Sequence, residues 1–410
     1  MTATSDFLII GGGLAGARAA EALRGEGFDG GISLIGEERL RPYLRPPLSK
    51  DYLQGTAERE SLFVHPADWY RDHDVELVLG IAATSVDRAH HRVVAADGSR
   101  RRFDKLLLCT GSTPIPLDIP GAHLGGIHYL RRMQDSERIK AAFTGSPRVV
   151  IIGGGWIGLE TATAARAAGL QVTLLEAASL PLVGVLGQQV AKLFAVLHRD
   201  HGVDLRCNVE VERLTGDDGA VSAVILRDGS VIDADLVIVG VGITPNVALA
   251  EEAGIAVDNG IVVDEHLQSS DPDVFAAGDV ANTFSSHLNR HVRVEHWANA
   301  EHQPAVAAAS MMGRSASYDR LPFFYSDQYD LGLEYTGYAE AGEYDRVVFR
   351  GDVEARTFIA FWLSGHRVLA GMNVNTWDVS KQIEAIITSG CSIDVDRLAD
   401  ASISLEDVRA

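Results

Sequence analysis

The chain has 410 residues, of which 46% are hydrophobic and 22% charged, and its formal net charge is −20. This length accommodates two or three domains with cores of their own, and the strong negative charge disfavours nucleic acid and anionic membranes as partners. No apolar run approaches the roughly 20 residues of a membrane-spanning helix, and no basic segment precedes residues 7–16 as in a signal peptide, so a cytoplasmic protein is expected.

The first predicted unit begins with FLIIGGGLAGARAAEAL, at residues 7–23. An apolar strand leads into Gly-x-Gly-x-x-Gly, formed by Gly11, Gly13 and Gly16, and an alanine-rich amphipathic stretch follows. A second apolar strand then ends at Glu37. A strand, a glycine turn, a helix and an acid at this spacing are typical of a dinucleotide-binding unit.

The middle of the chain repeats this pattern in VVIIGGGWIGLETATAA, at residues 149–165, with Gly153, Gly155, Gly158 and a later acid, Glu176. In each copy the first glycine permits the tight turn, the second lets a pyrophosphate approach the backbone, and the third lets helix and strand pack closely. The pyrophosphate lies at the helix N-terminus, and the acid accepts hydrogen bonds from a ribose. Two such units predict two bound dinucleotides, commonly a flavin and a nicotinamide.

The repetition extends to the end of each unit. DGSRRRFDKLLLCTGSTP at residues 97–114 aligns without a gap to DGSVIDADLVIVGVGITP at residues 228–245. Each segment is typical of a turn, an edge strand, a buried strand and a Gly and Pro exit, and turn signals upstream predict a three-stranded meander before each exit. The remaining region, from about residue 323, is predicted to form a short meander and then a helix from about Asp378 to Ser389.

These motifs resemble the two-dinucleotide-domain flavoprotein disulfide reductase superfamily and, within it, the NADH-dependent ferredoxin and rubredoxin reductases of oxygenase systems. The resemblance runs from about residue 6 to about residue 400. Its most specific motifs, in chain order, are RPYLRPPLSK (41–50), GGGWIGLE (153–160), VFAAGDVA (274–281), RVEHWANAEHQ (293–303), FFYSDQYDLGLEYTGYA (323–339) and SKQIEAIITSG (380–390).

The resemblance implies an α/β fold with two Rossmann-like dinucleotide-binding domains, each with an inserted β-meander, and a C-terminal α+β domain. The FAD-binding domain is then discontinuous, comprising residues 1–112 and 246–322. The NAD-binding domain comprises residues 113–245, and the C-terminal domain comprises residues 323–410.

The resemblance also assigns cofactor-binding residues. The FAD site is expected to comprise Gly11, Gly13, Gly16, Glu37, Arg45, Lys50, Ala82, Asp279, Trp297 and Tyr325. The site of the nicotinamide cofactor is expected to comprise Gly153, Gly155, Ile157, Gly158, Glu176 and Gly242. Ala177 and Ala178 follow Glu176, with no nearby arginine for a 2′-phosphate. A carboxylate binds a ribose hydroxyl but repels a phosphate, so NADH is expected rather than NADPH.

Two residues, Lys50 and Glu160, are expected to be catalytic. The family places a lysine beside the reactive edge of the isoalloxazine, and Lys50 matches it; Glu160 is its expected ion-pair partner. Arg45 is expected to hold the FAD pyrophosphate, and Asp279 to accept a hydrogen bond from the ribityl chain. Tyr325 stands where family members often carry tryptophan, which puts any role that needs an indole in doubt.

The three cysteines, Cys109, Cys207 and Cys391, are far apart and form no CxxC pair, so neither a disulfide framework nor a metal site is expected. Disulfide-reducing relatives place a CxxxxC pair, and peroxidases and oxidases a single cysteine, close to residues 37–60, which here contain none. The expected function is therefore transfer of a hydride from NADH to FAD and of single electrons to an external carrier, a small [2Fe-2S] ferredoxin or rubredoxin that feeds a downstream oxygenase.

Two alternatives stay open at this point. An NADH oxidase or peroxidase would react directly with oxygen species, and an apoptosis-inducing-factor-like flavoprotein would reduce carriers slowly. Turnover with a carrier separates all three. Acidic ferredoxins favour a basic docking face, for which the sequence offers only scattered candidates. The acidic Glu334 lies in the C-terminal domain. The basic candidates are Arg71, Arg290, Arg293 and Lys381.

Overall fold

A computed structural model describes residues 6–410 of the chain, and these divide into two compact units. The first unit contains the described residues up to Leu44 together with Arg59–Thr113 and Thr244–Pro322. The second contains Arg45–Glu58, Pro114–Ile243 and Phe323–Ala410. The chain crosses between the units five times, and two of these crossings lie in strands β8 (Ser112–Pro114) and β17 (Ile243–Pro245), which form a two-stranded sheet.

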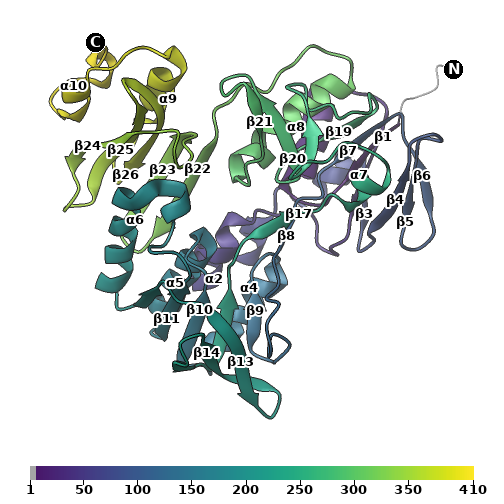
Figure 1. The fold of residues 1–410 in the computed structure, drawn as a ribbon. Helices are drawn as coiled ribbons and strands as arrows, with labels where there is room; N and C mark the ends of the chain where they lie inside the picture. Colours follow the sequence, from purple (N-terminus) through teal and green to yellow (C-terminus); the bar gives the residue numbers. More distant parts are fainter. Residues whose placement is uncertain (1–5) are drawn as a thin grey trace. The chain divides into compact units, whose positions relative to one another are not determined.

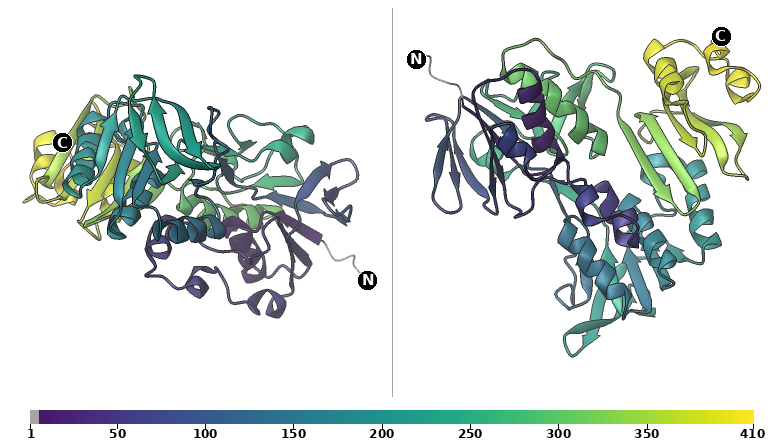
Figure 2. Two further views of the ribbon diagram at one scale, coloured as in Figure 1. Left: turned by 90° about the horizontal axis from the view of Figure 1, so that it is seen from below. Right: turned by 180° about the vertical axis from the view of Figure 1, so that it is seen from behind.

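The first unit is organised around a parallel sheet of order β19-β7-β1-β2-β3. Its strands are nearly continuous apolar runs, as expected where both faces of a parallel sheet are buried. One face packs against helices α1 and α8, which lie side by side (Figure 2, right). The bounds are β1 (Asp6–Ile10), β2 (Gly31–Gly36), β3 (Val75–Leu79), β7 (Lys105–Leu108), β19 (Val274–Ala276), α1 (Leu14–Gly25) and α8 (Trp297–Met311).

Smaller elements complete this unit. The predicted three-stranded meander is present as the antiparallel sheet β4-β5-β6, and a further small sheet has the order β18-β20-β21. The bounds are β4 (Ala83–Asp87), β5 (Arg92–Ala95), β6 (Arg100–Arg102), β18 (Ile261–Val263), β20 (Ala281–Ser285), β21 (Arg290–Val292), η2 (Arg59–Leu62), α3 (Trp69–Asp72) and α7 (Ala248–Glu252).

The second unit contains the repeat, a parallel sheet of order β12-β11-β10-β16-β9 (Figure 1). The second predicted meander is the antiparallel sheet β13-β14-β15. The bounds are β9 (Ile127–Tyr129), β10 (Arg148–Ile152), β11 (Gln171–Glu176), β12 (Asp204–Cys207), β13 (Val211–Asp217), β14 (Ala220–Leu226), β15 (Val231–Asp233), β16 (Leu236–Val239), α4 (Met133–Phe143), α5 (Trp156–Ala167) and α6 (Val183–Asp200).

The segment of residues 45–58 belongs to this second unit, although the expected domain boundaries place it in the FAD-binding part. It forms η1 (Pro46–Ser49) and α2 (Asp51–Gln54), which contact α4 and α5. The hydroxyl of Ser136 donates to the carbonyl oxygen of Leu48, and that of Tyr52 to the carboxylate of Glu137. These contacts join residues more than 80 positions apart, so near neighbours in the sequence do not indicate them.

The C-terminal part of the second unit is an antiparallel sheet of order β22-β23-β26-β25-β24, with α9 and α10 beside it (Figure 1). The predicted simple meander is therefore wrong, because β23 pairs with β26 and not with β24. β25 and β26 are apolar and almost wholly buried and so occupy central positions, whereas the more polar β24 lies at the edge. The bounds are β22 (Phe323–Gln328), β23 (Leu331–Gly337), β24 (Arg346–Asp352), β25 (Thr357–Ser364), β26 (Arg367–Val374), α9 (Ser380–Ser389), α10 (Val395–Ala399) and η3 (Leu405–Asp407).

The fold class expected from the sequence is confirmed: two Rossmann-like parallel sheets, each with a small antiparallel insert, and a C-terminal α+β part. Among the described residues, no helix has both the length and the apolar character needed to cross a membrane.

Candidate active site

The first glycine turn has the geometry that a bound pyrophosphate requires. Gly11 has a φ of +125°, and a Cβ there would lie 2.0 Å from the carbonyl oxygen of Cys109. A Cβ on Gly16 would lie 2.1 Å from the carbonyl oxygen of Gly11. By contrast, a Cβ on Gly13 would meet nothing within 4 Å. The first and third glycines therefore satisfy the fold, while the second leaves open space at the start of α1, where an anion is favoured.

The second glycine turn repeats this arrangement. Gly153 has a φ of +107°, and its Cβ would lie 2.3 Å from the carbonyl oxygen of Gly240. A Cβ on Gly158 would lie 2.0 Å from the carbonyl oxygen of Gly153, whereas one on Gly155 would have its nearest neighbour at 4.0 Å. The residues of both turns fit a dinucleotide, because each turn combines a close-packed backbone with free space at a helix N-terminus.

The acids after the second strands differ in their surroundings. Glu176 is the last residue of β11, and its carboxylate accepts hydrogen bonds from the backbone N–H groups of Gly154 at 2.5 Å and Ala178 at 2.7 Å. These contacts hold the acid beside the second fingerprint. Glu37 directly follows β2 and is exposed.

Three apolar side chains form an exposed rim at the carboxyl end of the second parallel sheet. Ile157 in the first turn of α5, Val241 after β16 and Ile115 are each 39–40% exposed. Gly242 has a φ of +120°, accepts a hydrogen bond from the Ile115 N–H, and would place a Cβ 3.3 Å from the Ile115 side chain. The sequence prediction included Ile157 and Gly242 but not Ile115 or Val241. Their signal was apolar residues next to the exit glycine, where a ligand can cover them.

The other residues expected around FAD in the first unit lie in separate segments. Asp279 follows Gly278, where an added Cβ would lie 3.2 Å from the Cβ of Ala15, so this turn lies against the start of α1. Trp297 is the first residue of α8. Ala82 precedes β4, and its carbonyl oxygen accepts a hydrogen bond from the backbone N–H of Ala96.

The predicted pairing of Lys50 with Glu160 is present within the second unit. The Lys50 Nζ lies 2.6 Å from Glu160 Oε1, and the two side chains are 12% and 4% exposed. The hydroxyl of Ser49 donates to Glu160 Oε2 at 2.5 Å, and that of Ser326 donates to Oε1 at 2.7 Å. A carboxylate with a cation and two hydroxyl donors is satisfied in its buried position, and it holds the ammonium group in place.

The neighbours of this pair come from β22. The Lys50 Nζ lies 5.7 Å from the centre of the Tyr325 ring. Burial raises the pKa of the Asp327 carboxyl. The charge of Lys50 opposes this rise in the pKa, and the charges of Glu160 and Asp51 add to it. Burial likewise raises the pKa of the Tyr325 hydroxyl. The remaining expected residue of this segment, Arg45, donates a hydrogen bond of 2.5 Å to the carbonyl oxygen of Arg131.

The cysteines offer no reactive thiol at either glycine turn. Cys109 is buried directly after β7, and burial raises its pKa well above the ordinary value. Burial also raises the pKa of Cys207, at the end of β12. A thiol with a raised pKa is a poor nucleophile.

Two of the basic candidates for a docking face, and the acidic Glu334, have local partners. Arg293 ion-pairs with Glu295 and is 9% exposed, while Arg71 lies beside Asp72. The carboxylate of Glu334 accepts hydrogen bonds from Asn373 and Ser380. The other two basic candidates, Arg290 and Lys381, lie on β21 and α9.

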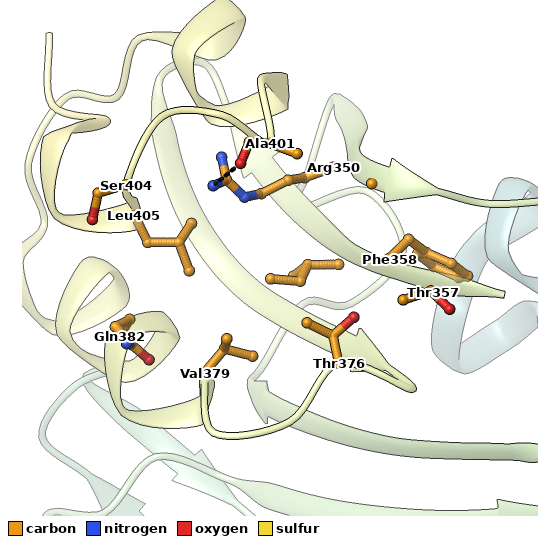
Figure 3. Close-up of a pocket in the computed structure, with 11 residues that line it drawn as sticks. Arg350, Thr357, Phe358, Thr376, Val379, Gln382, Ala401, Ser404 and Leu405 are labelled. Carbon is orange, nitrogen blue, oxygen red and sulfur yellow. Dashed lines mark hydrogen bonds between the residues drawn. The ribbon is translucent and has the colours of Figure 1, made fainter. Parts of the chain in front are cut away.

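A surface pocket of about 410 Å³ in the C-terminal part was not expected from the sequence (Figure 3). Its wall includes Phe358, Val379 and Leu405, and Arg350 lies at one end. The Arg350 guanidinium donates to the carbonyl oxygens of Leu398 and Asp400, at 3.2 and 2.6 Å, and also to those of Ala401 and Ile403. It therefore ties the C-terminal segment to edge strand β24.

Comparison with known proteins agrees with this organisation. Residues 5–304 match the family model described as pyridine nucleotide-disulphide oxidoreductase, and residues 323–409 match the model described as reductase C-terminal. The chain is 39% identical to putidaredoxin reductase CamA of Pseudomonas putida, covering 100% of this chain and 98% of the relative. It is 38% identical to rhodocoxin reductase of Rhodococcus erythropolis, covering 98% and 93%.

A solved structure shows the same fold. The reductase chain in the crystal structure of a covalent putidaredoxin reductase–putidaredoxin complex superposes with a TM-score of 0.95, at 38% identity, over 99% of this chain and 98% of that chain. The family uses FAD and a pyridine nucleotide, which the two glycine turns fit. The chain is therefore a flavoprotein oxidoreductase of the pyridine nucleotide-disulphide oxidoreductase family, and within it belongs to the ferredoxin and rubredoxin–NAD(+) reductases.

Proposed function

We propose that this protein oxidises NADH and delivers the electrons one at a time to a small [2Fe-2S] ferredoxin, or to a rubredoxin, that supplies an oxygenase. Bound FAD supplies the chemistry, because it accepts a hydride and releases single electrons. One NADH yields NAD⁺, one proton and two electrons, so two carrier molecules are reduced per turnover. Relatives named as ferredoxin–NAD(+) reductase components of dioxygenase systems support this proposal.

The observation that carries the proposal is the buried ion pair between Glu160 and Lys50, together with the lack of cysteine in the segment that contains Lys50. Disulfide reduction needs a thiol pair that takes electrons from the flavin, and residues 37–60 contain no cysteine. A fixed ammonium group in the same segment serves a different purpose. It stabilises negative charge that develops on the flavin during reduction, without forming a covalent bond.

The remaining residues are proposed to bind and orient the two cofactors. Glu176 accepts hydrogen bonds from the adenosine ribose of NADH and disfavours a 2′-phosphate by charge repulsion. Asp279 accepts a hydrogen bond from the ribityl chain of FAD. Arg45 interacts with the FAD pyrophosphate, and Trp297 and Tyr325 pack near the flavin ring.

Stopped-flow mixing of the purified yellow protein with NADH under anaerobic conditions tests the proposal, followed by cytochrome c reduction with and without a [2Fe-2S] ferredoxin. Rapid flavin bleaching and ferredoxin-dependent turnover are expected. Bleaching followed by fast reoxidation in air, with no gain from any carrier, would instead identify an NADH oxidase. Bleaching with slow turnover under both conditions would favour a flavoprotein of the apoptosis-inducing-factor-like type.

A further inference from the structure

A histidine that the cofactor sites do not use lies buried near the end of helix α6. His198 has 0% of its surface exposed, and its Nε2 lies 2.9 Å from the side-chain oxygen of Gln328 on β22. Burial lowers the pKa of His198 to about 4, so the ring is neutral at pH 7. A neutral imidazole carries one hydrogen, on either Nδ1 or Nε2, and its hydrogen-bond partners decide which.

The partners of His198 form a continuous chain that ends at Glu160. The amide nitrogen of Gln328 donates to the hydroxyl of Ser326 at 3.2 Å, and that hydroxyl donates to Glu160 Oε1 at 2.7 Å. Ser326 and Gln328 are each 1% exposed. Every member of this hydrogen-bond chain is therefore removed from bulk water. In such buried surroundings, hydrogen bonds to charged groups are strongest.

The direction of every hydrogen bond in this chain follows from the carboxylate. An ionised Glu160 can only accept, so the single hydrogen of the Ser326 hydroxyl must point toward it. That hydroxyl can then only accept from the Gln328 amide NH₂, which turns the amide oxygen toward His198. The oxygen needs a donor, and His198 must therefore carry its hydrogen on Nε2.

The turn after β22 places Tyr329 beside His198, at the end of the hydrogen-bond chain that lies farthest from Glu160. Tyr329, in the turn after β22, has a φ of +55°, which bulky residues rarely adopt. Its ring stacks on His201 with the ring centres 3.8 Å apart, and its hydroxyl lies 3.5 Å from Nδ1 of His198. This strained turn holds β22 against the end of α6.

We propose that His198 is a positioning residue for the Lys50–Glu160 pair, acting through Gln328 and Ser326. The Gln328 side-chain oxygen accepts the His198 hydrogen, which orients the Gln328 amide nitrogen to donate to Ser326. The Ser326 hydroxyl is thereby held with its own hydrogen directed at Glu160. The carboxylate thereby stays directed at Lys50. This inference rests on the proposed role of Lys50 in flavin reduction.

Other titratable groups act on the two ends of the chain and stay unchanged in the variants below. Asp51, Asp327 and Tyr325 lie near the Lys50–Glu160 pair. His201 lies near His198 and lowers its pKa further by charge. A change in the pH dependence of a variant can then be assigned to the loss of the hydrogen bonds that connect His198 with Glu160.

The tautomer of His198 provides a test independent of catalysis. In the flavin-containing protein labelled with ¹⁵N at histidine, the signals of His198 are identified by their loss in H198Q. A hydrogen on Nε2 is expected at pH 7, and E160Q should remove this preference, because an amide can donate as well as accept. A hydrogen on Nδ1, or an Nε2 preference that persists in E160Q, would overturn the inference.

Kinetics of flavin reduction by NADH between pH 5.5 and 9 provide the second test. In H198Q the glutamine amide can donate where Nε2–H did, so a profile close to the parent is expected. H198L and Q328M break the hydrogen-bond chain, so the Ser326 hydrogen is no longer held on Glu160. The acidic limb of the rate profile should move to higher pH, with roughly twofold slower reduction at pH 5.5.

Phe194, one turn earlier on α6, supplies a matched control. It is buried, packs edge-to-face on Trp156 and has no side-chain hydrogen-bonding group, so F194L should lower the melting temperature without moving the pH profile. If H198L behaves like F194L, the role of His198 is packing alone and the inference is wrong. If K50M reduces the flavin as fast as the parent, it is instead the proposed role of Lys50 that fails.

Discussion

The Lys50 ammonium and the Glu160 carboxylate lie 2.6 Å apart, although 110 positions separate them in the chain, and both side chains are almost removed from solvent. Two buried serine hydroxyls complete the surroundings of the carboxylate. Removing two charges from water is unfavourable unless both are paired and hydrogen-bonded. The chain meets this requirement with residues from the segment 45–58, helix α5 and strand β22.

Replacing Lys50 should therefore harm both stability and flavin reduction. K50M leaves the Glu160 carboxyl group buried without a cation, and we expect a loss of about 3 kcal/mol in the free energy of unfolding, together with slower bleaching by NADH. Denaturant titration and stopped-flow absorbance measure the two effects. Lys105, which pairs with Asp273 at the surface, is the matched control, and K105M should change stability by less than about 1 kcal/mol. Equal losses in the two variants would contradict this interpretation.

Two alanine substitutions in the second glycine turn should have opposite consequences. In G155A the added Cβ has free space in the fold but occupies the phosphate position, so NADH binding should weaken at least tenfold with little change in melting temperature. In G158A the Cβ would lie 2.0 Å from the carbonyl oxygen of Gly153, so the protein should be destabilised. Titration with NADH and thermal unfolding separate the two. Weak binding in neither variant would argue against a nucleotide at this turn.

Substitution of Glu176 should reduce the preference for NADH over NADPH. E176A removes the ribose acceptor and the charge that repels a 2′-phosphate, so kcat/KM with NADH should fall about tenfold while that with NADPH does not fall. Steady-state rates with both nucleotides measure the change. The exposed Glu212 offers a control of equal charge change, and E212A should leave the ratio of the two values as in the parent.

The buried histidine predicts a loss of stability in acid. The pKa of His198 is about 4 in the folded protein and near 6.5 when unfolded, so the unfolded state takes up a proton first as the pH falls. The stability associated with a neutral His198 is fully present above pH 6.5 and is lost between pH 6.5 and 4, by about 3 kcal/mol in total. H198Q cannot titrate and should flatten this part of the curve. Identical melting temperatures against pH in both proteins would disprove the assignment.

Arg350 should stabilise the C-terminal segment. R350M removes a cation that donates to four backbone carbonyl groups, and we expect about 2 kcal/mol of local destabilisation. Hydrogen exchange of residues 395–409 should accelerate, while exchange of the first parallel sheet stays as in the parent. If residues 395–409 exchange no faster in R350M than in the parent, this guanidinium does not hold the segment.

The sequence alone determined the two dinucleotide-binding units, their order and their meanders. Gly11 and Gly153 require left-handed backbone, Gly16 and Gly158 lie against carbonyl oxygens of their own turns, and such constraints involve near neighbours or a neighbouring strand. Buried parallel strands also have a distinct apolar pattern. These features depend on local conformation and residue type, so they can be predicted from a single chain.

Only the tertiary structure decided how distant segments combine within each unit. It grouped residues 45–58 with the second unit, put β26 beside β23, and brought His198 to Gln328, 130 positions away. It also added Ile115 and Val241 to the rim around Gly242. Pairings of this kind depend on which apolar faces and polar groups are complementary after burial. A histidine that only packs in the core and one that positions other residues have the same letter in the sequence. Only the surrounding hydrogen bonds can distinguish the two.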